Sequence, residues 1–255
     1  MLNYIGSELT RIYKKKSNYI FYISLLVIFT LSLFFSLSER TADSLAYYGF
    51  EVITFSVTIF GTQIYYAVYG DDYTYRTQTL VFSTGLSKLK YLIAKLFVFI
   101  IMVGTIYLVM ALYYYLIWFL LVGNGPNLAD RWVQILVIEA IHRIPTIIGF
   151  GLLASILSAF FQSANAGGIL YPFLSMGLIA RIFELLSHSV DWLAKPFSHL
   201  LTMQLYYIPS PELTIEGKMA MLPLSSGIFL AILGYIVVGI LLATLALSYK
   251  DTKVS

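Results

Sequence analysis

The chain has 255 residues, of which 59% are hydrophobic and only 11% are charged, and its mean hydropathy is +0.83. Ordinary soluble domains of this length are far less apolar, so the composition predicts an integral membrane protein. The net charge of +3 is too small to indicate nucleic-acid binding, and the absence of cysteine excludes disulfides and thiol chemistry.

The start of the chain combines apolar and charged side chains at helical spacing. Leu2, Ile5, Leu9 and Ile12 recur on one face, while charged residues lie elsewhere around the helix. This pattern predicts an amphipathic helix over residues 1–18 that lies in the membrane interface, with its lysines near anionic headgroups. A signal peptide is the competing interpretation, but the apolar stretch that follows is long for one and lacks a small-x-small cleavage site.

Six apolar runs are long enough to cross a hydrocarbon core of about 30 Å, which takes roughly 17–25 residues. The third is over-long and is expected to tilt or to project into the cytoplasm. The segment 183–221 before the sixth run is apolar and contains prolines, which predicts short external helices. The expected fold is a single all-α membrane domain, 1–255, with six transmembrane helices and an N-terminal interfacial helix. The predicted spans are Tyr19–Leu37, Phe50–Tyr69, Leu92–Val122, Pro145–Phe161, Ala166–Ile182 and Leu222–Leu247.

The placement of lysine and arginine predicts the orientation of these spans. If both termini are cytoplasmic, the inner segments hold ten of the 16 basic residues and the outer segments hold six. We therefore expect a multi-pass protein of the cell membrane with both termini inside.

The longest polar stretch between two apolar runs is the segment 70–91. It begins with Asp71 and Asp72, is broken at Gly85, and leads through Ser87 and Lys88 into the third predicted span. A segment this short cannot build its own core. We expect one or two short helices across the base of the bundle, with exposed side chains that contact a soluble partner. The alternative is a solvated cytoplasmic loop without a partner.

Motifs for other chemistry are weak. The chain has no phosphate-binding G-x-x-x-x-G-K-[ST] sequence and no hydrolase signature. Glu139, His142 and Arg143 share a helical face and suggest either an intramembrane acid–base site or a simple ion pair at the outer interface. His188, Asp191 and His199 include metal-ligating residue types, but chance accounts for their presence in one loop. The sequence therefore predicts no catalytic residue, no metal and no cofactor bound by this chain.

The polar segment resembles the loop between the second and third spans of ABC-2 type transporter permeases. In that family an acidic residue and a tyrosine are followed by a Gly-Thr pair, a Pro-x-Ser-Arg turn and a lysine that opens the third span. This chain departs from the pattern at Arg76, Gly85 and Lys88, where the family usually has glycine, proline and arginine. The order of an interfacial helix, six spans and a long external segment is also similar. The residues that carry the resemblance are Asp72-Tyr73, Thr77, Ser87-Lys88 and Ala94-Lys95.

The resemblance implies the permease subunit of an ATP-driven exporter, most similar to compact Gram-positive exporters of amphipathic peptides or toxins. Such permeases pair as dimers, as two identical copies or with a close paralogue. A separate ATPase subunit binds ATP and Mg²⁺, and its surface receives the loop and the N-terminal helix. Lantibiotic immunity or multidrug efflux is an alternative within the family, and an intramembrane enzyme or a sensor subunit is an alternative outside it. The residues expected to couple to the ATPase are Asp71, Asp72, Tyr73, Thr77, Gly85, Ser87 and Lys88.

The second predicted span offers neutral hydrogen-bonding groups among large apolar side chains. We expect these groups to line a transport path for an amphipathic peptide that enters sideways from the inner leaflet. The alternative is that they only pack one helix against another. Small residues and aromatics along the first and fifth spans, including Gly167, Gly168 and Gly177, are expected to allow close helix approach in a two-fold dimer. The candidate path residues are Thr54, Thr58, Thr62 and Gln63.

Overall fold

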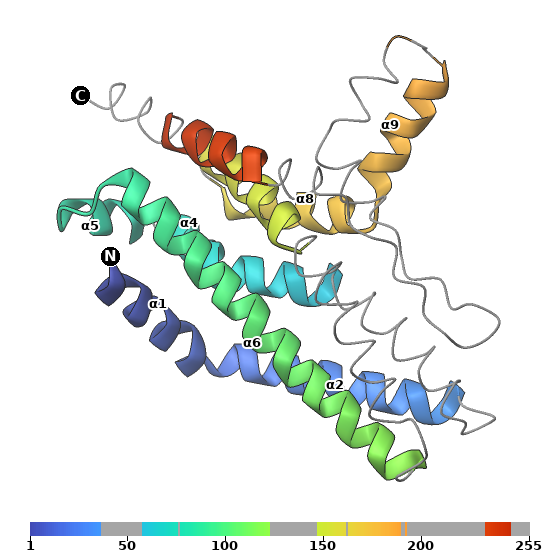
Figure 1. Cartoon of the computed structure of the whole chain (residues 1–255). Coiled ribbons are helices and arrows are strands. Elements are labelled where there is room, and N and C mark those ends of the chain that lie inside the picture. Colours follow the sequence, from blue (N-terminus) through green and yellow to red (C-terminus); the bar gives the residue numbers. More distant parts are fainter. Residues whose placement is uncertain are drawn as a thin grey trace.

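A computed structural model describes residues 1–36, 58–75, 77–122, 147–161, 163–189, 192 and 233–245 of the chain. Every regular element within these ranges is helical (Figure 1), which confirms the prediction of an all-α protein for the described residues. The predicted sites at Glu139, His142 and Arg143 and at Asp191 and His199 lie outside them.

The N-terminal segment forms two helices rather than one. Helix α1 covers Leu2–Lys14 and is strongly amphipathic, and α2 covers Lys16–Ser36 and is apolar on all sides. Lys15 separates them because its backbone is extended, with φ of −76° and ψ of 105°. The amphipathic helix predicted over residues 1–18 therefore ends four residues early, and α2 begins before the predicted span at Tyr19.

Helix α6, Lys88–Val122, is the longest described element, with 35 residues. At about 1.5 Å per residue it is about 50 Å long, well beyond the roughly 30 Å of a hydrocarbon core. Its Lys88–Ile117 portion is the one described straight helix that is both long enough and apolar enough to cross a membrane. The predicted third span, Leu92–Val122, thus lies within one continuous helix.

The other predicted spans are described only in part. The second span is helical from residue 58 to 65 and continues as the π-helix η1, Tyr66–Gly70, and then as α4, Asp71–Thr74. Ile147–Phe161 and Leu233–Leu245 are apolar helices of fewer than 18 residues within the predicted fourth and sixth spans. Six crossings are therefore not established by the residues that the structure describes.

The predicted fifth span, Ala166–Ile182, is not one straight helix. Helix α8, Ala164–Ser175, and helix α9, Leu178–Ser189, meet at an angle of 67°. The break falls at Gly177, whose φ of 71° is in the left-handed region that favours glycine. Pro172 lies inside α8.

The core lies where the helix over residues 58–70 packs between α6, α8 and the helix Ile147–Phe161. It is rich in aromatic residues, with Tyr65, Phe99, Phe150 and Tyr171 among its most deeply buried side chains. Gly167 and Gly168 lie directly against Tyr65 and Tyr66, so these glycines bring helices of one chain together. The expectation that they form a dimer surface is therefore wrong for these two positions, because the contact is already occupied within the chain.

Candidate functional site

One buried lysine joins three separate elements. Lys95, in the third turn of α6, is 0% exposed. Its Nζ lies 2.5 Å from Oε2 of Glu8 in α1 and 2.5 Å from Oδ2 of Asp72 in α4. The same group donates a hydrogen bond of 2.9 Å to the carbonyl oxygen of Val68 in η1. Since an unpaired ammonium would be strongly disfavoured here, these contacts hold α1, η1 and α4 against α6.

Asp72 is equally buried and fully hydrogen-bonded. The hydroxyl of Tyr91 donates to its Oδ2 at 2.6 Å, and the hydroxyl of Thr77 donates to its Oδ1 at 2.8 Å. The rings of Tyr91 and Tyr4 each lie with their centroids 5.8 Å from Nζ of Lys95, within the range of cation–π contacts. Asp72 thereby connects the first turn of α5, Thr77–Ser83, with the start of α6.

A second layer of ion pairs covers Lys95 on the solvent side. Asp71 pairs with Arg11 and also accepts from Nζ of Lys15 at 2.9 Å. Arg11 in turn pairs with Glu8 at 2.9 Å and donates to the carbonyl oxygen of Ala67 at 3.2 Å. We call these six charged residues the Lys95 cluster: Glu8, Arg11, Lys15, Asp71, Asp72 and Lys95. With three acidic and three basic members its formal charge is zero, and the exposed outer pairs contribute less to stability than the buried ones.

Two adjacent aspartates reach different partners because neighbouring residues of a helix point about 100° apart. The π-helix η1 is buried at four of its five positions and leads without a break into α4. Asp72 pairs with Lys95 of α6, and Asp71 pairs with Arg11 and Lys15 at the C-terminal end of α1.

The charges of the cluster change the pKa of its neighbours. Burial raises the pKa of Tyr4 well above its ordinary value, and the carboxylates of Asp72 and Glu8 raise it further. Burial lowers the pKa of Arg11, but the hydrogen bond and charge of Glu8, with the charge of Asp71, more than offset this and raise it. The phenol of Tyr4 therefore stays neutral and Arg11 stays charged at neutral pH.

The structure brings together some of the residues that the sequence singled out for coupling. Asp71, Asp72 and Thr77 lie within the Lys95 cluster or bind it, and the half-buried ring of Tyr73 packs against the core. Gly85 and Ser87 form the turn before α6, where Gly85 has a φ of 87° and Oγ of Ser87 accepts from the backbone N–H of Lys90 at 3.4 Å. Lys88 is half-buried in the first turn of α6.

The sequence did not indicate the pairing of Glu8 with Lys95. Glu8 was assigned to the polar side of the interfacial helix, yet it is only 8% exposed. A signal was present, because a lysine that is followed by a long apolar helix needs a carboxylate partner, and Glu8 is the one acid in the first 18 residues. Only the placement of α1 beside α6 shows that the two meet.

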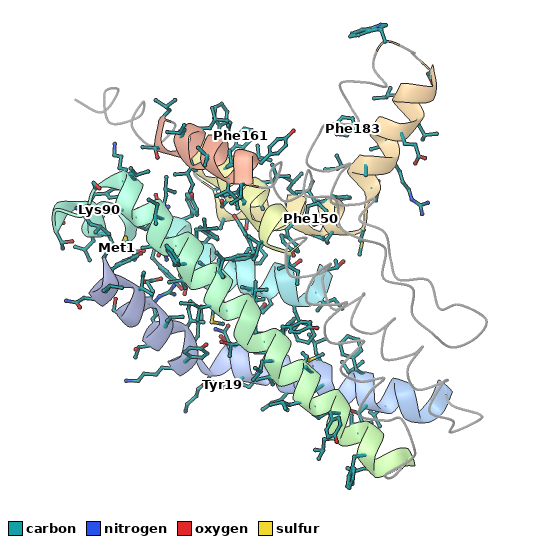
Figure 2. The ribbon with its side chains drawn as sticks, viewed as in Figure 1. Met1, Tyr19, Lys90, Phe150, Phe161 and Phe183 are labelled. Carbon is teal, nitrogen blue, oxygen red and sulfur yellow. The ribbon has the colours of Figure 1, made fainter. Side chains whose placement is uncertain are left out.

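The outer face of the same region is a hollowed surface with exposed apolar residues. A cavity of about 520 Å³ opens between α1 and α5, and Glu8, Leu80 and Gly85 are among the residues that line it. Leu80 is 68% exposed, and Met1, which also lines the cavity, is 48% exposed. Met1 and Lys90 lie at this end of the molecule (Figure 2). We call the lining of this cavity the α1–α5 face.

The candidate path residues are engaged in packing where the structure describes them. Oγ1 of Thr62 donates to the carbonyl oxygen of Thr58 at 2.6 Å, and Thr58 itself is buried. Nε2 of Gln63 donates to Oδ1 of Asn18 in α2 at 3.2 Å. Thr54 lies outside the described residues. These contacts favour the alternative that the hydroxyl and amide groups join helices.

Comparison with protein-family models, with curated proteins and with solved structures finds no match to this chain. Within the described ranges, no group of three or more histidine, aspartate or glutamate residues could hold a metal ion. The contacts that the described site shows are ion pairs and hydrogen bonds among buried and half-buried side chains.

Proposed function

We propose that this chain is the membrane-spanning permease subunit of an ATP-driven exporter, and that a separate ATPase subunit binds it at the α1–α5 face. The observation that carries the proposal is the Lys95 cluster. It joins the amphipathic helix α1 and the short helix α4 to an apolar helix of 35 residues by ion pairs, and Thr77 of α5 is hydrogen-bonded to Asp72 of the cluster. In this proposal a movement of α1 or α4 is transmitted to α6 through the ion pairs, and a movement of α5 through the hydrogen bond between Thr77 and Asp72.

The apolar surface of the long helices supports a membrane location. Leu108, Leu112 and Leu120 of α6 are 59%, 62% and 71% exposed, and Ile20 of α2 is 65% exposed. In water such a surface would favour aggregation, whereas in a bilayer it meets acyl chains. The α1–α5 face lies at one end of these helices (Figure 1), as expected for a surface at the membrane boundary.

The α1–α5 face has the composition of a docking surface. Large apolar side chains such as Leu80 and Met1 are exposed beside polar ones, and a cavity between two helices can receive a side chain from a partner. The sequence contains no phosphate-binding loop, so the proposal places ATP and Mg²⁺ on the partner. Two copies of the permease, or one copy and a paralogue, would then enclose the transport path.

Amphipathic peptides or other hydrophobic compounds are the proposed substrates. They partition into the inner leaflet with their apolar face buried by about 5–10 Å, so transport can begin from the bilayer. The alternatives within the same class are lantibiotic immunity and multidrug efflux. ATP hydrolysis by the purified complex, measured with and without added peptides, separates these substrates.

The proposal predicts that a charge on the α1–α5 face uncouples the ATPase. In the complex purified from native membranes, Leu80→Glu is expected to lower Mg²⁺-ATP hydrolysis by about tenfold or more, because a central apolar contact would be replaced by a buried charge. Ser189→Glu, on an exposed position of α9, is the matched control and should leave turnover unchanged. Equal turnover in Leu80→Glu and the wild type would contradict the docking role of this face.

A further inference from the structure

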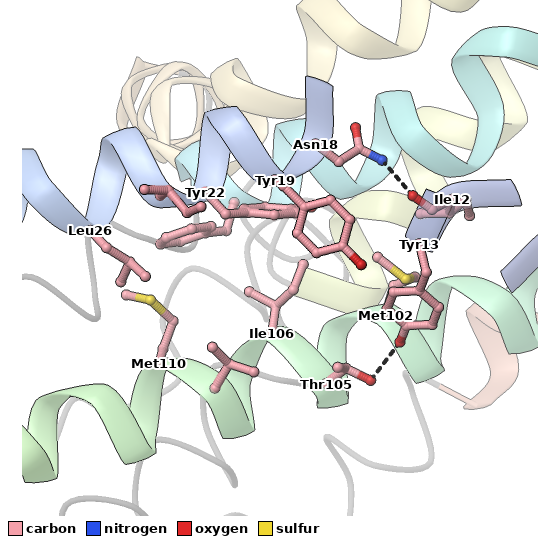
Figure 3. Close-up of a pocket in the computed structure, with 13 residues that line it drawn as sticks. Ile12, Tyr13, Asn18, Tyr19, Tyr22, Leu26, Met102, Thr105, Ile106 and Met110 are labelled. Atoms are coloured by element: carbon pink, nitrogen blue, oxygen red, sulfur yellow. Dashed lines mark hydrogen bonds between the residues drawn. The ribbon is translucent and has the colours of Figure 1, made fainter. Parts of the chain in front are cut away.

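A second cavity, of about 210 Å³, lies between the α1–α2 junction and the middle of α6 (Figure 3). Tyr13, Tyr19 and Tyr22 form its wall on one side, and Ile106 and Met110 of α6 form the other. Tyr19 is 51% exposed and Val109, also in the wall, is 49% exposed. The cavity therefore opens between α2 and α6, on the same side as their apolar surface.

The polar groups around this cavity are mostly bonded to one another. Nδ2 of Asn18 donates to the carbonyl oxygen of Ile12 at 3.1 Å, and the hydroxyl of Tyr13 donates to Oγ1 of Thr105 at 3.0 Å (Figure 3). An apolar cavity of roughly 150 Å³ stays dry and binds hydrocarbon, so a larger one is suited to the same kind of occupant. The hydroxyl of Tyr22 is buried away from the cavity and has no hydrogen-bond partner among the described residues, so the surface that faces the cavity is apolar.

Two positive charges lie next to the cavity in the sequence and are not used by the Lys95 cluster. Lys14 and Lys16 flank the α1–α2 junction and are exposed, and neither makes an ion pair with a described residue. Lys15 between them is bound to Asp71. The junction thus presents two exposed ammonium groups, on residues one position after Tyr13 and three positions before Tyr19, and both of these tyrosines line the cavity.

We infer that this junction is a binding site for one anionic phospholipid, with an acyl chain in the cavity and the phosphate headgroup held by Lys14 and Lys16. The inference rests on the proposed membrane location but not on the ATPase or on a transported substrate. Lysines beside the interface attract anionic headgroups, and the apolar wall accepts a chain. A helical peptide is about 10–12 Å across, which is too wide for a cavity of 210 Å³.

The test uses the purified full-length chain in detergent, titrated with dioleoyl phosphatidylglycerol or dioleoyl phosphatidylcholine and followed by native mass spectrometry. Both lipids carry the same acyl chains, so the comparison isolates the headgroup charge. Phosphatidylglycerol is expected to bind about tenfold more tightly, and Lys14→Ala/Lys16→Ala should reduce its affinity to that of phosphatidylcholine. Ile106→Trp, which fills the cavity, should abolish binding of one equivalent of either lipid.

Leu108→Trp is the matched control, because it places the same side chain on the exposed face of α6 and should leave lipid binding unchanged. The inference is overturned if Ile106→Trp binds phosphatidylglycerol like the wild type, or if the double lysine variant does so. The lysine variant alters only surface residues, so it decides the question even where Ile106→Trp does not fold. Displacement of the lipid by an amphipathic helical peptide at equal concentration would instead assign the cavity to a peptide and would also overturn it.

Discussion

Replacing Lys95 with methionine is expected to lower the free energy of unfolding by about 3–5 kcal/mol, the usual effect of removing one partner from a buried ion pair. The substitution keeps a long unbranched side chain but removes the ammonium group that pairs with the carboxylates of Glu8 and Asp72, which both lie 2.5 Å from Nζ of Lys95. It also removes the donor to the carbonyl oxygen of Val68. Reversible unfolding of the purified protein in detergent measures the difference.

Lys90→Met is the matched control, because Lys90 lies on the exposed side of the same helix. It should change stability by less than about 0.5 kcal/mol, as surface substitutions usually do. Adding Glu8→Gln to Lys95→Met should recover part of the lost free energy of unfolding, because a neutral amide then replaces one of the two carboxylates that lost their partner. If Lys95→Met and Lys90→Met are equally stable, Lys95 does not hold these helices together.

Gly167→Ala is expected to be the second most damaging substitution. An added methyl group would meet the carbonyl oxygen of Ala154 as well as the hydroxyls of Tyr65 and Ser158. A backbone carbonyl cannot rotate away as the end of a side chain can, so α8 must move and the free energy of unfolding should fall by about 1–3 kcal/mol. The same movement would weaken the hydrogen bond of 3.1 Å that the backbone N–H of Gly167 donates to Oγ of Ser158.

The comparison for this substitution is Gly104→Ala in α6. A methyl group at residue 104 meets nothing within 4 Å, and the position lies inside a long helix. Alanine is preferred to glycine there by about 0.5–1 kcal/mol, so Gly104→Ala should stabilise the protein slightly. Opposite signs for the two changes support the packing of α8 against the helix Ile147–Phe161, and equal signs contradict it.

The sequence predicted the elements whose signal is local. The apolar run after Leu92 indicated a long helix, and the amphipathic pattern before Lys15 indicated a separate N-terminal helix. The start of α6 was placed four residues late, because the prediction followed hydrophobicity and the first residues of the helix are polar. The helix begins at Lys88, where Oγ of Ser87 accepts a hydrogen bond from the backbone N–H of Lys90. Likewise, hydrophobicity did not show that the break between α8 and α9 falls at Gly177.

The candidate site was predictable only in part. Asp71, Asp72 and Thr77 were singled out from the polar segment and do lie together, but they were expected to be exposed to a partner, whereas Asp72 is 4% exposed. Its burial depends on Lys95 and on Glu8, which is 87 residues from Lys95 in the sequence. Such a contact depends on tertiary packing, which no local pattern encodes. The exposed residues of the α1–α5 face, such as Leu80 and Met1, are better candidates for contact with a partner.

The most direct measurement of the central claim uses the absence of cysteine from the chain, which makes any single introduced thiol the only one present. Leu80→Cys places that thiol on the α1–α5 face, and a membrane-impermeant maleimide reports its accessibility in sealed vesicles. The account predicts labelling in inverted vesicles but not in right-side-out vesicles, and slower labelling when the ATPase subunit is bound. Labelling only in right-side-out vesicles, or at the same rate with and without the ATPase, would contradict it.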